Sequence, residues 1–546
     1  MKHILTLLSA LMLTLFCGQA NAQTNKSDNN DYNLQRAWEA LREEHDEAKA
    51  MDLVNRQLKE TPDNVQALLL RVRLYRKKGE YGAALADVNH ALQVNKPKRS
   101  DVPNSTLHWW KAHLYTDMME KEKAVASFAK AYELARKDDK ENLQNISFDY
   151  GVSLLSMDRY DESIAIFDAM LKEDETDAAA MVGKASVLIK RGQNSDAVTL
   201  LEKAKRYAEN YAEVYRFLMK AYDRMGERSK AVDAGLDWFD KDDDFQTDSL
   251  VVVLAKRPNY AEASIKGRSK TSEEPIRWSM LLCDFYEHLH KYAEAVKCYD
   301  EMERTYGRYD QFNVRRSDCY SELGLFDRAI EDISVAMDGE ADWYNLCSRG
   351  EYYREAGRLD EAINDFSAAI EEDPRYAFPY YRRGWCYELK GDRARAIEEY
   401  NLGIELDEDY PYLYLMRGEL LLLEGKNDEA KADFEQVIQR DTVIGNHTCR
   451  MYALHFLRRD QEAEEWMDAV IAQDPDHAGN YYDRACLYAR MGRLDESVAA
   501  LKTAFEKGYR SFAHIGLDDD MDPIRELWEF KALMAEYQEI HEAYLK

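Results

Sequence analysis

The chain lacks the short motifs that mark the commonest catalytic and metal sites. It contains no G-x-x-x-x-G-K-[ST], no G-x-S-x-G and no H-E-x-x-H, so no phosphate-binding loop, nucleophile elbow or zinc-protease helix is indicated. None of its eight cysteines stands in a C-x-x-C pair, which removes local support for a tetrahedral zinc site. We therefore predict that the protein is not an enzyme and that it holds no metal and no cofactor.

Positive charge is also scarce, because 74 lysines and arginines face 103 aspartates and glutamates, giving a formal net charge of −29. A nucleic-acid-binding protein needs a positive surface to meet phosphates, so we expect no nucleic-acid partner. Binding to anionic lipid through the general surface is disfavoured for the same reason. The charge favours solubility and neutral or basic partners.

The first 22 residues have the pattern of a secretory signal peptide. Lys2 precedes an apolar run over residues 4–16, and Ala20-Asn21-Ala22 provides a cleavage site. We expect cleavage near Ala22 and export to the periplasm or the medium of a bacterium. No later stretch is long and apolar enough to span a bilayer, so we expect no transmembrane segment after cleavage.

Cys17 suggests an alternative, lipid attachment to a new N-terminal cysteine of an outer-membrane lipoprotein. That pattern requires a small residue before the cysteine, whereas Phe16 is bulky. We therefore favour plain export. Of the seven remaining cysteines most lie in apolar helical patterns, so we interpret them mainly as buried thiols, with a single disulfide as the alternative.

A spacing of about 34 residues recurs along most of the chain. The segment RGEYYREAGRLDEAINDFSAAIEEDP, from Arg349, is followed 34 residues later by RGWCYELKGDRARAIEEY and then by RGELLLLEGKNDEAKADF. This period is typical of stacked helix-turn-helix units. Thirteen units start at Asp31, Val65, Ser105, Gln144, Ala178, Ala212, Ile276, Asp310, Trp343, Ala377, Pro411, Ile444 and Ala478.

Two positions of the repeat have clear physical roles. Position 20 is alanine or serine in all thirteen units, from Ala50 to Ser497, which allows two helices to approach closely. Position 15 is glycine in eight units, which predicts a left-handed residue that ends the first helix. Aspartates such as Asp360 and Asp495 follow closely, and we expect them to cap the second helix and to complement its dipole.

These features resemble the tetratricopeptide repeat family from about Asp31 to Gly508. The resemblance implies an all-α protein, an α-solenoid of about 13 helix pairs wound as a right-handed superhelix with a concave groove. It also implies a protein that binds peptides or proteins, since few members are enzymes through their repeats. A helical pattern after Pro523 predicts a C-terminal capping helix. Asp518, Asp520 and Asp522 have calcium-loop spacing, but Pro523 replaces the required glycine, so we favour a capping role.

Irregular segments suggest the domain boundaries. The stretch from residue 242 to residue 275 breaks the period and holds a short apolar run and a polar loop. One alternative is two lobes joined by a hinge, and the other is one continuous solenoid with an irregular unit. The predicted parts are 1–22 signal peptide, 23–30 flexible N-terminus, 31–241 N-terminal lobe, 242–275 irregular repeat or hinge, 276–511 C-terminal lobe and 512–546 capping segment.

The resemblance also places repeat positions 2, 5, 9, 12 and 13 on the inner face. In the later lobe these positions are rich in aromatic residues, which suit recognition because few rotors are frozen on binding. The rings could instead pack against neighbouring repeats or close the superhelix. The predicted groove residues are Tyr344, Phe378, Tyr381, Trp385, Tyr412, Tyr452, Phe456 and Tyr482. In the earlier lobe the same positions predict a basic strip at Arg73, Arg76 and Lys77, continued by Arg216, Lys220 and Arg224.

The sequence therefore predicts an exported scaffold that binds a protein or peptide in a groove, in envelope assembly or secretion. A glycan-binding envelope protein that stacks sugars on its aromatic residues is one alternative. An enzyme with a site in the irregular segment is another, although no motif supports it. The sequence leaves the oligomeric state open.

Overall fold

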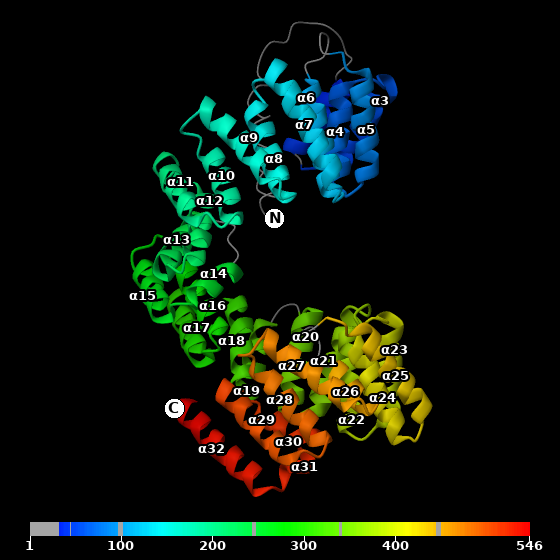
Figure 1. The fold of residues 1–546 in the computed structure, drawn as a ribbon. Coiled ribbons are helices and arrows are strands. Elements are labelled where there is room, and N and C mark those ends of the chain that lie inside the picture. The colour runs from blue at the N-terminus through cyan, green and yellow to red at the C-terminus, as the bar shows by residue number, and fades with distance from the viewer. Residues whose placement is uncertain are drawn as a thin grey trace. The chain divides into compact units, whose positions relative to one another are not determined.

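The computed structural model describes residues 32–43, 45–96, 102–242, 247–337, 341–443 and 449–545. Within these residues the chain forms 31 α-helices and one 3-10 helix, and no strand (Figure 1). The predicted signal peptide with Cys17, the N-terminus over residues 23–30, and the repeat starts at Asp31 and Ile444 lie outside the described residues. No described helix is long and apolar enough to cross a membrane.

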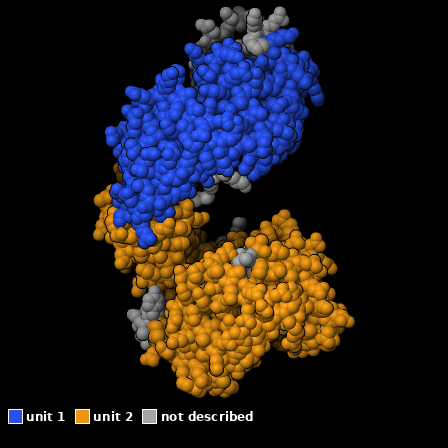
Figure 2. Space-filling model, in the orientation of Figure 1, with its two compact units in different colours: residues 1–243 blue, residues 244–546 orange. Residues whose placement is uncertain are grey.

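The chain divides into two compact units, residues 1–243 (unit 1) and residues 244–546 (unit 2), which are coloured separately in Figure 2. The division falls near the start of the segment 242–275, whose role as a hinge stays a prediction. That segment contains the short helix α14 (Asp248–Leu254) and the helix α15 (Pro258–Ser269), which begins at a proline.

Unit 1 is a stack of antiparallel helix pairs, in which even-numbered helices come first and odd-numbered helices second. In chain order its helices are α2 (Tyr32–Arg42), α3 (Glu47–Glu60), α4 (Val65–Lys77), α5 (Tyr81–Val94), α6 (Asn104–Asp117), α7 (Lys121–Asp138), α8 (Leu143–Ser156), α9 (Tyr160–Glu173), α10 (Ala178–Lys190), α11 (Asn194–Tyr207), α12 (Ala212–Arg224) and α13 (Arg228–Lys241).

Unit 2 continues the same alternation after α14 and α15. Its further helices are α16 (Pro275–His288), α17 (Tyr292–Tyr306), α18 (Asp310–Glu322), α19 (Phe326–Ala336), α20 (Trp343–Glu355), α21 (Leu359–Glu372), α22 (Ala377–Leu389), α23 (Arg393–Leu406), α24 (Pro411–Leu423), α25 (Asn427–Arg440), α26 (Cys449–Phe456), α27 (Asp460–Gln473), α28 (Ala478–Arg490) and α29 (Leu494–Lys507). A C-terminal segment of α30 (Phe512–Leu517), η2 (Asp519–Met521), α31 (Asp522–Arg525) and α32 (Trp528–Leu545) follows.

The turn at repeat position 15 is left-handed in all thirteen repeats. The eight predicted glycines have φ between 68° and 80°, and five residues other than glycine adopt a positive φ at the same position. Those five are His45, Met119, Asp158, His290 and Arg458. Residues other than glycine adopt a positive φ only at an energetic cost. The repeat geometry is therefore kept even where the residue type does not favour it. The α-solenoid fold predicted from the spacing is therefore confirmed.

The expectation for the aspartates after this turn was wrong in one respect. Asp360 and Asp495 lie in the first turns of α21 and α29, whose N-cap residues are Arg358 and Arg493, and neither helix end has a side-chain capping bond. Their carboxylates can therefore act on the helix dipole but not as caps. A small shift of the helix boundary produces this difference.

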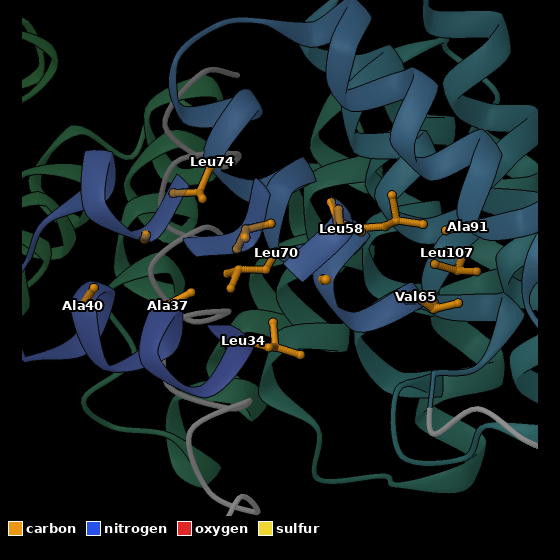
Figure 3. Close-up of a cluster of buried hydrophobic side chains, with 13 residues drawn as sticks. Leu34, Ala37, Ala40, Leu58, Val65, Leu70, Leu74, Ala91 and Leu107 are labelled. Atoms are coloured by element: carbon orange, nitrogen blue, oxygen red, sulfur yellow. The ribbon is translucent and has the colours of Figure 1, made fainter. Parts of the chain in front are cut away.

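Close approach between helices builds the core. Every alanine or serine at position 20 is at most 2% exposed, and Ser163 and Ser497 donate hydrogen bonds of 2.7 Å to carbonyls of the first helix. The cluster in Figure 3 draws Leu34, Leu58 and Leu107 together with other small and aliphatic side chains from α2 to α6. Each repeat thus buries its apolar surface against its neighbours, as expected of a solenoid.

A ladder of partly buried ion pairs also joins the repeats. In five repeats an arginine at position 7 pairs with an acid sixteen residues later. Arg349 donates to both carboxylate oxygens of Asp365 at 2.7 and 2.8 Å, and to the Ser334 hydroxyl of the preceding repeat at 3.2 Å. One guanidinium thus links three helices. The pairs are Arg71 with Asp87, Arg316 with Asp332, Arg349 with Asp365, Arg383 with Glu399 and Arg417 with Asp433.

The C-terminal segment caps unit 2, as predicted. Ile515, Met521 and Ile524 are fully buried in a cluster with side chains of α28 and α29. Further along, His541 of α32 donates from Nε2 to the carbonyl oxygen of Leu323, 2.7 Å away, in the turn that follows α18. The end of unit 2 therefore contacts one of its first helix pairs, and the unit closes on itself.

Candidate partner-binding surfaces

The first helices form the inner side of each stack. Within unit 1, α8 contacts α10 and α10 contacts α12, and within unit 2 the series α20, α22, α24, α26 and α28 does the same. Second helices of successive repeats contact one another less. Because the inner side of a curved stack is the shorter one, the first helices lie on the concave side, where the predicted groove residues were placed.

The eight predicted groove residues of unit 2 differ in exposure. Tyr344 is 60% exposed and lies with its ring edge-on to Trp343. Tyr381 and Tyr482 are only 5% and 4% exposed. The other five, Phe378, Trp385, Tyr412, Tyr452 and Phe456, are half-buried. Their role in partner binding stays a prediction.

These rings contact other side chains of the same unit. Tyr381 lies 5.5 Å from Tyr412 between ring centroids, and Tyr482 stacks on Tyr509 at 4.5 Å. Phe456 stacks on Phe434 at 4.7 Å. Offset and edge-on pairs of this kind stabilise a core beyond the area they bury.

Arginines cover the faces of several of these rings. The Arg354 guanidinium lies 4.0 Å from the Trp385 centroid, and Arg382 lies 5.3 Å from the same ring. Arg490 lies over both Tyr452 and Phe456. A cation held over an aromatic face is favourable when it is shielded from water, and Arg354 is only 5% exposed. Ring faces that a partner would use are therefore occupied by the protein.

The C-terminal segment adds further contacts on the inner side of unit 2. His514 of α30 lies edge-on to Trp385, with its Nδ1 3.7 Å from Glu355. Asp518 accepts a hydrogen bond of 2.6 Å from the Tyr482 hydroxyl. Residues of α20, α22 and α28 thus meet the tail of the chain. No sequence pattern indicates these contacts, because the segments lie far apart along the chain.

Carboxylates gather around Arg490. Its Nε donates to Asp520 at 2.5 Å and its Nη2 donates to Glu419 at 3.0 Å. Burial raises the pKa of Asp520 despite this arginine. Glu388 accepts from the Tyr400 hydroxyl at 3.0 Å, and burial followed by repulsion from Glu419 raises the pKa of Glu388 to about 7. This part of the inner side therefore carries more acid than the nearby cation balances.

One group of described residues has the spacing of metal ligands. Single ligand atoms of Cys486, Asp518 and Asp520 lie within 4.8 Å of one another. The two carboxylates already accept from Tyr482 and Arg490, and Asp518 also caps η2 by accepting from the Asp520 amide at 2.9 Å. Protein donors thus satisfy these oxygens, and Asp518 has the capping role expected for it.

The predicted basic strip of unit 1 is largely neutralised. Arg76 pairs with Asp117 at 2.5 Å and Lys77 pairs with Glu47. The Arg73 guanidinium lies between two indole rings, 5.3 Å from Trp38 and 5.8 Å from Trp110. Arg76 and Lys77 therefore present little uncompensated charge. The acidic partners of Arg76 and Lys77 come from neighbouring repeats.

A second cationic group in unit 1 is different. Lys190 ends α10, and α12 presents Arg216, Lys220 and Arg224 one turn apart. Arg216 pairs with Glu213, and Arg224 donates to the Ile189 carbonyl at 2.6 Å. Lys190 and Lys220 are exposed and have no ion pair among the described residues. Burial by surrounding atoms, and then the nearby cations, lower the pKa of Lys220 to about 8.

Cys283 and Cys298 form a disulfide between α16 and α17, with a Cα–Cα distance of 5.9 Å. Cys319, Cys347, Cys386, Cys449 and Cys486 are free and buried. The sequence predicted mainly buried thiols and left a single disulfide open as the alternative. The structure has five buried free thiols and this one disulfide.

Comparisons with known proteins agree with this architecture. Family profiles described as tetratricopeptide repeat match residues 154–221, residues 347–411, and residues 105–138, 411–442 and 478–506. A chloroplastic protein of Arabidopsis thaliana is 27% identical over 82 residues. That match covers 14% of this chain and spans 24% of the plant protein.

Similar solved structures come from several sources, each with a TM-score of 0.28. A crystal structure of MamA is 20% identical and covers 29% of this chain and 94% of its own. The C-terminal part of a TPR repeat-containing protein from Cytophaga hutchinsonii is 18% identical, and the match covers 44% of this chain and 98% of that one. A chain of the APC/C hetero-tetramer Cut9-Hcn1 is 13% identical, and the match covers 87% of this chain and 96% of that one. Together with the helix pairs, the family matches show that this chain contains tetratricopeptide repeats.

Proposed function

We propose that the protein is an exported scaffold that holds a protein or peptide partner on the concave side of unit 1. The observation that carries this proposal is the difference between the two inner sides. In unit 2 the protein's own arginines and C-terminal segment cover the aromatic rings. In unit 1 the described first helices α8, α10 and α12 pack mainly on their neighbours in the stack, and α10 and α12 present exposed cations.

Two observations support export. The pattern of residues 1–22 is that of a cleaved signal peptide. The disulfide between Cys283 and Cys298 suits an oxidising compartment, because thiols in the cytosol are kept reduced. The periplasm or the medium is therefore the proposed location, with envelope assembly or secretion as the setting.

Glycan binding is the second candidate. Tyr344 is 60% exposed and Tyr376 is 42% exposed, and Tyr376 stacks on Trp343 at 4.2 Å. Exposed rings near one another can pack against sugar faces. The two candidates differ in the unit used, since these rings belong to unit 2.

Site-specific photo-cross-linking tests the scaffold. A photoreactive phenylalanine analogue would replace Val152 on α8, and in a matched variant it would replace exposed Leu402 on the second helix α23. We expect position 152 to capture a defined protein in intact cells and position 402 to capture none of it. Identical products from both positions, or none from position 152, would contradict the proposal. A glycosidase-sensitive product from the same analogue at position 344 of unit 2 would favour glycan binding instead.

A further inference from the structure

Two lysines on the first helices of unit 1, Lys190 and Lys220, have no ion pair among the described residues. Acids outnumber bases, 103 to 74, and cations on the first helices of unit 1 commonly meet an acid or an amide oxygen. Lys184 pairs with Asp168 at 2.6 Å, and Lys111 donates to Asn89 at 2.8 Å. Lys190 and Lys220 lack such a partner among the described residues, although acidic side chains are abundant. Their charge is therefore left available on the concave side.

Two of these cations lie over a buried aromatic ring. The Arg216 and Lys220 head groups lie 4.6 and 5.4 Å from the centroid of the Phe217 ring, which is 8% exposed. Ile189, 4% exposed, belongs to the adjoining end of α10, and Arg224 is bonded to its carbonyl. Because Phe217 and Ile189 are buried, this surface offers a ligand mainly positive charge.

We propose that the ends of α10 and α12 form a recognition site for an acidic, extended segment of a partner protein. The proposal rests on the proposed scaffold function and names its ligand. Carboxylates would complement Lys190, Lys220, Arg216 and Arg224, of which Arg216 alone pairs with an acid, Glu213, among the described residues.

A protein segment fits better than a polyanion. The cationic group is small, and the chain as a whole carries a net charge of −29. A long polyanion would extend beyond the site and meet repulsion, whereas a short acidic segment need not. The state of Lys220 agrees, because a bound carboxylate would raise its pKa from about 8 towards the ordinary value.

Fluorescence anisotropy on the full mature protein tests the site directly. The probe would be a labelled peptide of alternating Glu and Leu, with an alternating Lys and Leu peptide and an oligogalacturonate as comparison ligands. The site variant K190E/K220E would be compared with K140E/K172E, which makes the same change of charge at exposed lysines that have no ion pair in the described structure. Circular dichroism would verify that both variants are equally helical.

We expect the acidic peptide to bind wild type and K140E/K172E alike, and the site variant at least about tenfold more weakly. We also expect affinity to fall between pH 7 and pH 9 as Lys220 loses its proton, and Lys220→Arg to bind more tightly than wild type at pH 9. Equal affinity in both double variants, or tighter binding of the Lys peptide or the oligogalacturonate, would overturn the inference.

The two proposals can fail separately. Cross-linking from position 152 without any effect of K190E/K220E on peptide binding would remove the acidic site and leave the scaffold. Charge-dependent peptide binding without a cross-linked protein in cells would do the reverse.

Discussion

The raised pKa of Glu388 makes a quantitative prediction for unit 2. This glutamate lies on α22, accepts from the Tyr400 hydroxyl at 3.0 Å, and is repelled by Glu419 and Asp519. Burial is the largest cause of the pKa shift from 4.5 to about 7. Replacement of Glu388 by Gln keeps the size and the acceptor oxygen but removes the charge.

The sign follows from proton linkage. Between pH 4.5 and about 7 the folded state holds the proton more tightly than the unfolded state, so the free energy of unfolding falls as pH rises through this range. Each pKa unit corresponds to about 1.4 kcal/mol, so the charged form costs unit 2 up to roughly 3 kcal/mol above pH 7. Water that reaches the half-buried side chain reduces this value.

Hydrogen exchange of α22 and α24 in the full chain would measure the effect, with exposed Glu398→Gln as the control. We expect Glu388→Gln to raise the free energy of local opening by about 1–3 kcal/mol at pH 8. At pH 5, where folded wild type is already protonated at this site, the gain should largely vanish. Lower protection at pH 8, or the same gain at both pH values, would refute the assignment of an uncompensated buried charge.

Three other predictions concern the repeats and the cysteines. Gly418→Ala places a Cβ 2.7 Å from buried Phe434 and should lower the free energy of unfolding in urea by about 1–3 kcal/mol, with part of the loss recovered by Phe434→Leu; a stabilised single variant would contradict the close packing. Arg417→Met leaves Asp433, 5% exposed, without its partner and should cost about 3–5 kcal/mol, whereas a second change of Asp433 to Leu should restore much of it. Thiol titration of the denatured mature protein should find five thiols without reductant and seven with it, and seven in both conditions would exclude the disulfide.

The repeat count could be predicted from the sequence because local geometry dictates it. A small residue at position 20 and a glycine turn at position 15 recur at a fixed spacing, and each has a physical role within its own helix pair. The five turns without glycine show the limit. Met119 and Arg458 adopt the same positive φ, but nothing in these residue types indicates it, so only the register reveals them.

The ion-pair ladder could have been predicted and was missed. Arg349 and Asp365 are sixteen residues apart, and the same spacing joins Arg417 to Asp433. Once the repeat frame is known, the recurrence at positions 7 and 23 is visible in five repeats. A basic residue on a first helix therefore indicates a binding site only if no acid at position 23 of the same repeat pairs with it.

The aromatic lining of unit 2 could not be assigned from the sequence for a different reason. Rings that line a groove and rings that stack on one another occupy the same repeat positions, so Trp385 and Tyr482 fit either role. The distinction depends on His514 and Asp518, which reach these rings from the C-terminal segment. Such long-range contacts leave no periodic signal.

The two units differ in where they keep unfavourable charge, and this difference bears on function. In unit 2 the excess carboxylates near Arg490 meet other parts of the same unit, and the buried side chains of the C-terminal segment hold them there. In unit 1 the unfavourable charge is Lys220, which faces solvent on the concave side and has no ion pair among the described residues. A lysine whose pKa is lowered by surrounding atoms and nearby cations lowers stability at neutral pH, since the unfolded chain binds the proton more tightly. A carboxylate from a partner would remove that penalty. Binding at this position would therefore be favoured by the free energy that the unpaired Lys220 costs the folded protein.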